Sequence, residues 1–372
     1  MRILHILGSL DRGGTESWLV QVLRHIDRQQ YQFDFLVFGQ GPYDFQADVE
    51  ALGARVIPCA SPDNVLLFSR NFIRVLRNFG PYDCVHSHVH YFSGLPVALA
   101  RVAGIPIRIV QSHTDQTLLD AESSRLRRAY AWTMRRVIWL TATQGTAVSR
   151  RAADSLFPSG WRRSDRWSTI PMGIDLEPFE RTVDHLQVRQ ELGIAPDAIV
   201  VGHVGRFMAP KNHSLLVDIA HELVKLAPNA KFLLVGEGPL RRTIELKVSS
   251  LGLARNFIFA GVRSDVPRLM KGAMDVFLFP SRYEGLGLVV LEAQAAGLPC
   301  VVSDVVPEEA NAGTGLVVRA SLNEPPSDWA RKLLSFFGPG IRLRQDSAAS
   351  AAVGSIQNSA ERLVDLYRTS RL

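Results

Sequence analysis

Cysteine is scarce in this chain of 372 residues. Cys59, Cys84 and Cys300 lie far apart, and no Cys-x-x-Cys or Cys–His spacing is present. We therefore expect three small buried side chains, with neither a disulfide framework nor a cysteine zinc site. Few cysteines, and an apolar start too short for a secretory leader, favour a cytoplasmic protein. No run approaches the roughly 18 apolar residues that a membrane span needs, so any membrane contact would be peripheral.

The fingerprint G-x-G-x-x-G of dinucleotide-binding proteins is also missing. After the first apolar run the chain reads GSLDRGGTES, and no acidic residue closes the second run, FDFLVFGQG. These two absences argue against an oxidoreductase that binds NAD.

Lysine is absent before Lys211, so all basic side chains of the first half other than histidine are arginines. Seven arginines and no acidic residue occur between Ser123 and Ala153, and the stretch Arg125–Arg136 mixes them with aromatic residues. Two interpretations stay open here: a solvated helix face, or a peripheral contact with an anionic membrane. The net charge of +6 suits an anionic partner. No nucleic-acid-binding motif accompanies it, so nucleic acid is not expected.

Short apolar runs alternate with longer amphipathic stretches in both halves of the chain. The predicted strands cover 2–7, 33–38, 54–59, 83–88 and 107–113, and then 198–207, 230–239, 256–262, 275–281 and 299–304. This βαβ rhythm predicts an α/β protein with parallel sheets covered by helices on both faces. The rhythm lapses across 154–198, a stretch rich in proline, glycine and charge that predicts a linker.

We therefore expect two doubly wound domains, each binding ligand at the carboxyl ends of its strands. Residues 1–176 form the first and 177–354 the second. The last helical pattern, within 355–372, is expected to pack back on the first domain.

Two carboxylates flank a glycine-rich turn in RYEGLGLVVLE, residues 282–292. Glu284 precedes the turn, and Glu292 lies about one turn into an otherwise apolar helix, on the face shared with Leu288, Leu291 and Ala295. Burying a carboxylate costs several kcal/mol unless it is paired. Carboxylates accept hydrogen bonds from sugar hydroxyls, and the helix amides suit an anion. The alternative is that Glu292 pairs with a core side chain.

Two cations follow the first strand of the second half, in GHVGRFMAPKNH. Arg206 lies at the end of that strand and Lys211 five residues later. Both should face the same strand ends as Glu284, where they could hold a diphosphate and neutralise it as it departs.

The stretches GRFMAPKNH, LLVGEGP, FPSRYEGLGLVVLEAQAAGLPCV and IPMGID together resemble the retaining glycosyltransferases of family four. The resemblance runs along nearly the whole chain and implies the GT-B fold, with two Rossmann-like domains facing across a cleft. It implies transfer of a hexosyl or N-acetylhexosaminyl group from a nucleotide-diphosphate sugar to a hydroxyl of a glycan or lipid-linked acceptor. The stretch PYDCVHSHVHYFSG is most similar to members that build bacterial capsule or exopolysaccharide.

The resemblance also implies roles for individual residues. Arg206 and Lys211 would hold the donor diphosphate, and Glu292 would accept hydrogen bonds from the ribose. The other implied contacts are Glu284 with the amides of Gly285, Leu286 and Gly287 at the donor sugar, Gly13 and Gly14 at the phosphates, and His113 near the reacting sugar. We expect UDP-sugar in preference to GDP-sugar. We expect no metal, because Asp-x-Asp occurs nowhere in the sequence.

Some positions depart from the family pattern or admit other interpretations. Family members usually carry Gly-Gly and then a glutamate after the strand matching CVVSD, whereas this chain offers only Glu308 or Glu309. His86, His88 and His90 have the spacing of a metal cluster, but family members bind no metal there, so we interpret them as structural or acceptor-side residues. The alternatives to a transferase are a nucleotide-sugar epimerase of the same fold and a non-catalytic nucleotide-sugar-binding protein.

Overall fold

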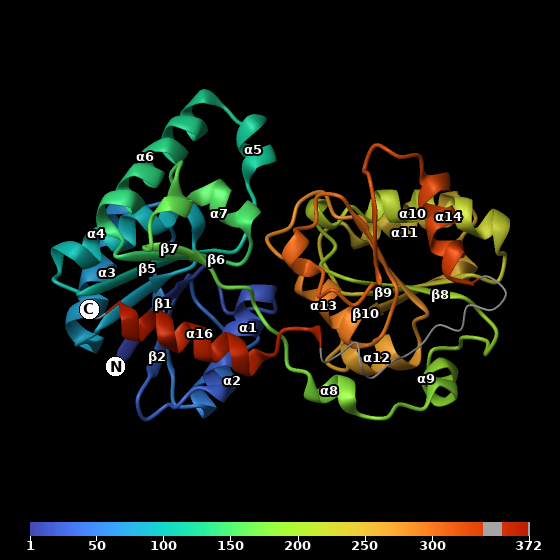
Figure 1. Cartoon of the computed structure of the whole chain (residues 1–372), viewed down its shortest axis with the longest axis horizontal. Coiled ribbons are helices and arrows are strands. Elements are labelled where there is room, and N and C mark those ends of the chain that lie inside the picture. The colour runs from blue at the N-terminus through green and yellow to red at the C-terminus, as the bar shows by residue number, and fades with distance from the viewer. Residues whose placement is uncertain (338–351, 371–372) are drawn as a thin grey trace. The chain divides into compact units, whose positions relative to one another are not determined.

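The computed structural model describes residues 1–337 and 352–370, and it divides into two compact units, each built on its own parallel sheet (Figure 1). One unit comprises Met1–Gly173 with Ser355–Leu372, and the other comprises Ile174–Gly354. The sequence places this boundary after residue 176. All three cysteines are buried and free, as the composition predicts. Among the described residues, no helix combines the length and the apolar character needed to cross a bilayer.

The first unit contains a seven-stranded parallel sheet in the order β3-β2-β1-β4-β5-β6-β7. Its strands are β1 (Arg2–Leu7), β2 (Gln32–Phe38), β3 (Arg55–Cys59), β4 (Cys84–Ser87), β5 (Ile107–Ser112), β6 (Gln144–Ala147) and β7 (Trp167–Thr169). The strand order reverses between β1 and β4, where His5 lies opposite His86 in the register.

The prediction of a linker at residues 154–198 is wrong over much of this range. The range contains β7, the last strand of the first sheet, and the short helices α8 (Glu177–Glu180) and α9 (His185–Glu191). These elements have three to seven residues. Elements of this length are too short to show a periodic apolar pattern.

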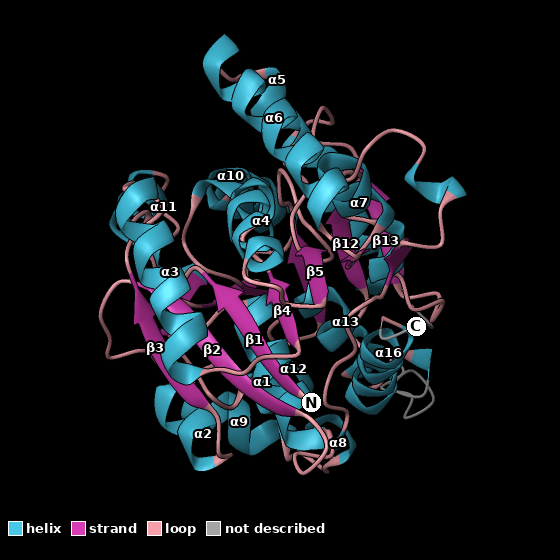
Figure 2. Cartoon of the chain, turned by 90° about the vertical axis from the view of Figure 1, so that its left-hand side faces the viewer, coloured by secondary structure: helices cyan, strands magenta, loops and turns pink. Residues whose placement is uncertain are grey.

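Helices of the first unit form two groups that the right-handed crossover rule places on opposite faces of its sheet (Figure 2). α1 packs against α2 and α16, whereas α4 packs against α3 and α6. Their bounds are α1 (Gly14–His25), α2 (Gln46–Ala51), α3 (Val65–Phe79), α4 (Gly94–Val102), α5 (Thr117–Ala121), α6 (Arg125–Thr141), α7 (Arg150–Leu156) and α16 (Ile356–Thr369), with 3₁₀ turns η1 (His90–Ser93) and η2 (Trp161–Arg163). The last helix of the chain therefore belongs to the first unit.

The second unit contains a six-stranded parallel sheet in the order β10-β9-β8-β11-β12-β13. Its strands are β8 (Val200–Val204), β9 (Lys231–Val235), β10 (Phe257–Gly261), β11 (Val276–Phe279), β12 (Cys300–Ser303) and β13 (Val317–Ala320). Its other elements are α10 (His213–Leu226), α11 (Arg241–Ser250), α12 (Val266–Gly272), α13 (Leu288–Ala295), α14 (Pro326–Leu334), η3 (Ala209–Lys211), η4 (Ala254–Asn256), η5 (Glu308–Ala310) and η6 (Ser335–Phe337). Here the strand order reverses between β8 and β11.

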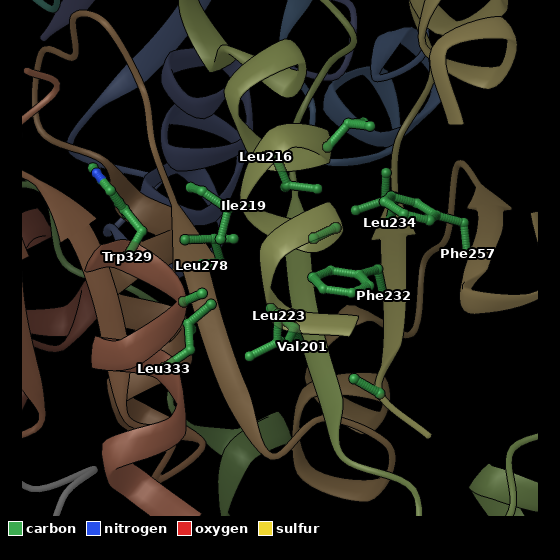
Figure 3. Close-up of a cluster of buried hydrophobic side chains, with 14 of the residues drawn as sticks. Val201, Leu216, Ile219, Leu223, Phe232, Leu234, Phe257, Leu278, Trp329 and Leu333 are labelled. Carbon is green, nitrogen blue, oxygen red and sulfur yellow. The ribbon is translucent and has the colours of Figure 1, made fainter. Parts of the chain in front are cut away.

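The core of the second unit lies between its sheet and the helices α10, α11 and α14 (Figure 3). Leu216, Ile219 and Leu223 line one side of α10 and meet apolar side chains of the strands. Trp329 of α14 is fully buried, and its indole N–H donates to the Ser321 carbonyl at 3.1 Å. A buried side chain of this size contributes several kcal/mol through the area it removes from water.

The loops that follow β8 and β9 pack backbone against backbone. Gly205 N–H donates to the Val235 carbonyl at 2.9 Å, and Phe207 N–H donates to the Glu237 carbonyl at 2.8 Å. Gly236 has φ +136°, and a Cβ atom there would lie 2.2 Å from the Gly205 carbonyl oxygen. Only glycine fits, because neither the backbone angle nor the space admits a side chain.

Gly236→Ala should therefore destabilise the second unit by about 3 kcal/mol, because the Cβ atom would displace neighbouring backbone. Gly252→Ala is the matched control: its φ is +71°, but no atom lies within 4 Å of its Cβ position. That change should cost about 1 kcal/mol from the backbone angle alone. Thermal unfolding of both variants measures the contrast, and equal losses would contradict it.

Candidate functional site

An ion pair joins the two loops at the strand-order reversal of the second unit. β8 and β11 are parallel neighbours, so their carboxyl ends lie at the same edge of the sheet. Lys211 ends η3 beyond β8, and Glu284 lies beyond β11. Lys211 Nζ donates to Glu284 Oε1 at 2.6 Å, with side chains 23% and 11% exposed. The structure thus brings together a predicted cation and a predicted acid 73 residues apart.

Several local contacts hold Lys211 in place. Its Nζ lies 4.8 Å from the centroid of the Phe279 ring, at the end of β11. Arg282 N–H donates to the Pro210 carbonyl at 2.8 Å, which ties the two loops together beside the ion pair. Asn212 then takes a left-handed conformation, with φ +53°, before α10 begins. An ammonium group fixed in this way is a preorganised site for an anion.

The glycine-rich turn leads into α13 with buried backbone. Gly285, Leu286 and Gly287 are all buried, and Gly287 has φ +89° at the N-cap position of the helix. A glycine has no side chain that could cap the first amides of the helix. These amides and the positive end of the helix dipole therefore suit a phosphate or a sugar hydroxyl.

Glu292 lies in the second turn of α13 and is half-buried. Its neighbours Leu291 and Ala293 are buried. Burial raises the pKa of Glu292 to about 7. The carboxyl group therefore changes charge close to neutral pH, and a partner that hydrogen-bonds to the carboxylate would stabilise the charged form.

The remaining predicted residues of this unit lie on nearby loops. Arg206 is exposed and lies between β8 and η3. Glu308 and Glu309 begin η5, after β12. Glu308 is 81% exposed and lies 3.3 Å from Arg319, whereas Glu309 is half-buried.

Two buried histidines next to Lys211 were not predicted as site residues. His203 Nδ1 lies 2.9 Å from the Leu278 carbonyl, and the His213 ring stacks on Phe207 with centroids 4.1 Å apart. Burial, with Lys211 as a smaller contribution, lowers the pKa of His213 to about 4. Burial, followed by the neighbouring His213, holds the pKa of His203 well below its ordinary range. Both rings are therefore neutral. The only sequence signal for them was their place within the stretch GHVGRFMAPKNH.

In the first unit, Gly13 and Gly14 begin α1 after the β1 loop. Gly13 is the N-cap of the helix, and a Cβ atom there would lie 2.3 Å from Glu16 Oε2. His113 directly follows β5, and its Nε2 lies 2.8 Å from His88 Nδ1. Burial lowers the pKa of His113 to about 3, so the ring is neutral at physiological pH.

The structure brings His5 together with His86 and His88, whereas the sequence spacing groups His86 and His88 with His90. One ring nitrogen from each of His5, His86 and His88 lies within 4.8 Å of the other two. His90 begins η1, and its Nε2 lies 3.4 Å from Ser155 Oγ. His5 was missed because nothing in the first apolar run marks a histidine that faces the fourth strand.

Two family models and many known proteins match the chain. The model described as a glycosyl transferase 4-like domain matches residues 13–173, and the model described as glycosyl transferases group 1 matches residues 184–335. EpsF of Bacillus subtilis, a protein assigned as a glycosyltransferase, is 36% identical over 99% of this chain and 97% of its own. The chain belongs to the group 1 glycosyltransferases.

Two further similarities add detail to this family membership. A galactosyltransferase of Escherichia coli, whose name gives UDP-Gal as donor and GlcNAc-diphosphoundecaprenol as acceptor, is 28% identical over 60% of this chain and 58% of its own. HepE of Anabaena, solved with UDP and with UDP-glucose, aligns over 99% of this chain and all of its own, with a TM-score of 0.81 and 19% identity. The second similarity confirms the predicted GT-B fold of two Rossmann-like domains. The roles of individual residues, the donor and retention stay predictions.

Replacing Glu292 by glutamine should stabilise the chain in a pH-dependent way. The folded pKa, about 7, lies above the ordinary value of 4.5, so the cost of the buried carboxylate grows as pH rises between these values. We expect Glu292→Gln to raise the free energy of unfolding by about 2 kcal/mol more at about pH 8.5 than at about pH 5.5. Thermal unfolding across this range measures the difference.

Glu191→Gln serves as the control for this pH dependence. Glu191 is exposed, and its hydrogen bond from Arg268 lowers its pKa. Stability linked to this group is present above its ordinary pKa, so the change to glutamine should bring no gain at high pH. A Glu292→Gln gain that does not grow with pH would contradict the raised pKa.

Proposed function

We propose that the chain transfers a hexosyl or N-acetylhexosaminyl group from a nucleotide-diphosphate sugar to a hydroxyl acceptor with retention of anomeric configuration. The observation that carries this proposal is the Lys211–Glu284 pair of 2.6 Å beside the glycine turn that opens α13. A fixed cation, the amides at the start of a helix and carboxylates together match the three parts of such a donor: diphosphate, sugar and ribose. Membership of the group 1 glycosyltransferases supports the same reaction class.

In this proposal Lys211 and Arg206 bind the diphosphate and stabilise the charge that develops as it leaves. In the free chain Glu284 neutralises Lys211. An incoming diphosphate offers the ammonium group of Lys211 a stronger anionic partner and so releases Glu284. Glu284 then accepts hydrogen bonds from the donor sugar, and the amides of Gly285, Leu286 and Gly287 donate hydrogen bonds to the same sugar. Glu292 accepts from the ribose hydroxyls, and those bonds favour its ionised form.

The glycines at the start of α1 and His113 complete the proposed set of residues from the first unit. Gly13 and Gly14 have no side chains that would keep a phosphate away from the first amides of α1. His113 acts as a neutral hydrogen-bonding group at the reacting sugar, because its pKa is far below neutral. Cationic side chains replace a metal in this scheme, and a UDP-sugar is the preferred donor. The complexes of HepE with UDP and UDP-glucose support that preference.

Helix α6 has the surface expected of a protein that takes its acceptor from a membrane. Only Ala131 and Ile138 of its 17 residues are buried, while Leu126 is 84% and Trp132 62% exposed. A hollow beside this helix is lined by Arg128, Trp132, Arg135, Arg136 and Trp139 of α6, and by Tyr91, Asp120, Pro158 and Ser159 of neighbouring segments. Arginines interleaved with exposed apolar rings favour the interface of an anionic membrane over bulk water.

We further propose that the chain acts at the cytoplasmic face of the membrane on a lipid-linked acceptor, in the synthesis of exopolysaccharide, capsule or another cell-surface glycan. The acceptor in the name of the Escherichia coli relative, a sugar on diphosphoundecaprenol, supports this class of acceptor.

Lys211→Ala should lower kcat/KM for the preferred donor by about 100-fold or more, because one preorganised charge at the leaving group is worth that much. Glu284→Ala should give a loss of similar size. A panel of UDP- and GDP-sugars, with donor hydrolysis and transfer as readouts, measures both. Lys225→Ala is the matched control, since Lys225 forms an exposed ion pair of 2.7 Å with Glu222 elsewhere in the same unit.

Unchanged transfer in Lys211→Ala would contradict the proposed role of this side chain. The alternative functions give their own results in the same assay. Donor binding without turnover indicates a binding protein, and conversion of the donor to its epimer without an acceptor indicates an epimerase. UDP should raise the thermal midpoint of the chain, whereas NAD should not.

Replacing Arg125, Arg128 and Arg136 together by glutamine should weaken binding to anionic vesicles. Each arginine near a charged surface contributes about 1 kcal/mol, so the triple change should cost about 100-fold in affinity. Vesicle flotation measures the loss. Arg135 is left intact, because it donates to the Asp154 carbonyl at 3.1 Å and to the Phe157 carbonyl, and so holds α6 on α7.

The control replaces the same number of exposed arginines on α3, namely Arg70, Arg74 and Arg77. That variant carries the same total charge but keeps the α6 surface, so it should still float with the vesicles. Equal losses of vesicle binding in the two variants would show that binding depends on the net charge of the chain and not on the surface of α6.

A further inference from the structure

A chain of hydrogen bonds runs through the first unit from His113 to the last helix. His113 Nε2 lies 2.8 Å from His88 Nδ1, and His88 Nε2 lies 2.9 Å from His5 Nδ1. Tyr367 of α16 continues the chain, with its hydroxyl 3.5 Å from His5 Nε2 and 2.9 Å from His86 Nδ1. We refer to these five residues as the histidine relay.

All the titratable groups of the relay are neutral. Burial lowers the pKa of His5 and His113 to about 3, and holds those of His86 and His88 well below their ordinary range. Burial also raises the pKa of Tyr367 well above its ordinary value. Each neutral ring therefore has one N–H donor and one bare nitrogen, and the phenol has one O–H donor.

Because each ring carries a single proton, the donor or acceptor state of one ring nitrogen depends on the other rings of the relay. A neutral ring that accepts at one nitrogen donates from the other, so the bonds among His113, His88 and His5 all run in the same direction. The two ends of the relay are His113 Nδ1 and His86 Nε2, and neither has a hydrogen-bond partner among the described residues. The phenol oxygen has two lone pairs, so it can accept from His5 while its own proton is donated to His86.

Tyr367 decides that direction. Its single proton is given to His86 Nδ1 at 2.9 Å in preference to His5 Nε2 at 3.5 Å, because hydrogen-bond strength falls steeply with distance. His5 then donates from Nε2 to the phenol oxygen and accepts at Nδ1 from His88. His88 in turn accepts at Nδ1 from His113 Nε2–H, which leaves His113 Nδ1 as a bare acceptor. The cost is one buried N–H without a partner, at His86 Nε2.

We propose that Tyr367 is a positioning residue that fixes the tautomer of His113 through His5 and His88, so that Nδ1 is the acceptor for a sugar hydroxyl. This deepens the proposed transferase function and rests on it for the identity of the hydroxyl. In the free chain Nδ1 is buried, so the side chains around it must move before a hydroxyl can reach it. Trp18 packs near the His113 ring, with centroids 6.3 Å apart, and its N–H also has no partner among the described residues. A hydroxyl, which both donates and accepts, can donate to a bare Nδ1.

The other interpretation of the cluster is a bound cation at His5, His86 and His88. Imidazole nitrogens are suitable zinc ligands. However, the ring nitrogens of His5 and His88 already satisfy each other at 2.9 Å, so an ion would have to break that bond. Only His86 Nε2 is without a partner among the described atoms of these three rings. The hydrogen-bonded relay therefore accounts for more of the observed contacts.

The experiment is to measure the tautomers by NMR on the full chain labelled with ¹⁵N-histidine. Two-bond ¹H–¹⁵N couplings distinguish protonated from bare ring nitrogens, and a His113→Asn spectrum assigns the His113 signals. In the free wild-type chain we expect His113 protonated at Nε2 and bare at Nδ1. In Tyr367→Phe the relay loses its fixed end, so the two His113 nitrogen signals should move towards each other as both tautomers become populated.

Kinetics give a second readout in the same variants. Tyr367→Phe should lower kcat by about fivefold, the worth of one hydrogen bond, with the donor KM nearly unchanged. Tyr31→Phe is the matched control, because the Tyr31 hydroxyl also contacts α16, by accepting from Arg368 at 3.0 Å, but lies outside the relay. It should leave both the His113 tautomer and kcat unaltered.

Three results would overturn the proposal. They are wild-type His113 protonated at Nδ1, a His113 tautomer that does not respond to Tyr367→Phe, and stoichiometric Zn²⁺ binding that raises the thermal midpoint and is lost in His86→Gln. The wild-type spectrum decides the first result even if Tyr367→Phe fails to fold. Because the tautomer is measured without substrate, a chain that transfers no sugar would refute the proposed function and leave this test intact.

Discussion

The reversal of strand order in each sheet is the constraint on which the chemistry of this chain depends. At such a reversal, the chain segments that follow two neighbouring parallel strands run in opposite directions. An opening therefore forms between the carboxyl ends of the two strands. In the second unit this occurs between β8 and β11, and the loops there bring Lys211 to Glu284. In the first unit it occurs between β1 and β4, and these two strands carry His5 and His86 of the histidine relay. The same topological rule therefore positions charge in one unit and neutral hydrogen-bonding groups in the other.

The two edges differ because their side chains experience different surroundings. Lys211 and Glu284 form an ion pair of 2.6 Å at the edge of the sheet, with part of each side chain exposed. His5, His86 and His88 are buried, and burial disfavours the imidazolium form, so these rings act only through the direction of their hydrogen bonds. Glu292 lies between these cases: it is half-buried, and its pKa near 7 makes its charge sensitive to what binds beside it.

Sequence alone could predict the contact between Lys211 and Glu284, because each follows closely on a buried apolar run and parallel strands align their ends. It could not predict the role of His5 or Tyr367. Their contact joins residues 362 positions apart and depends on which strand lies beside β1 and where α16 packs. Strand β7 was missed for another reason: three residues are too few to show an apolar period, and their place in the sheet comes from pairing with β6.

The relay also joins the last helix of the chain to β1 and β4 of the first unit. The first unit is made from two segments separated by the whole second unit, and Tyr367 is fully buried within it. Helix α16 begins with Ser355 capping the Asn358 amide and then packs against α1. During synthesis the second unit can therefore complete its core before the first one can, even though most of the first emerges earlier. Until α16 docks, His5 and His86 have no phenol between them, and the direction of the hydrogen bonds leading to His113 is not set.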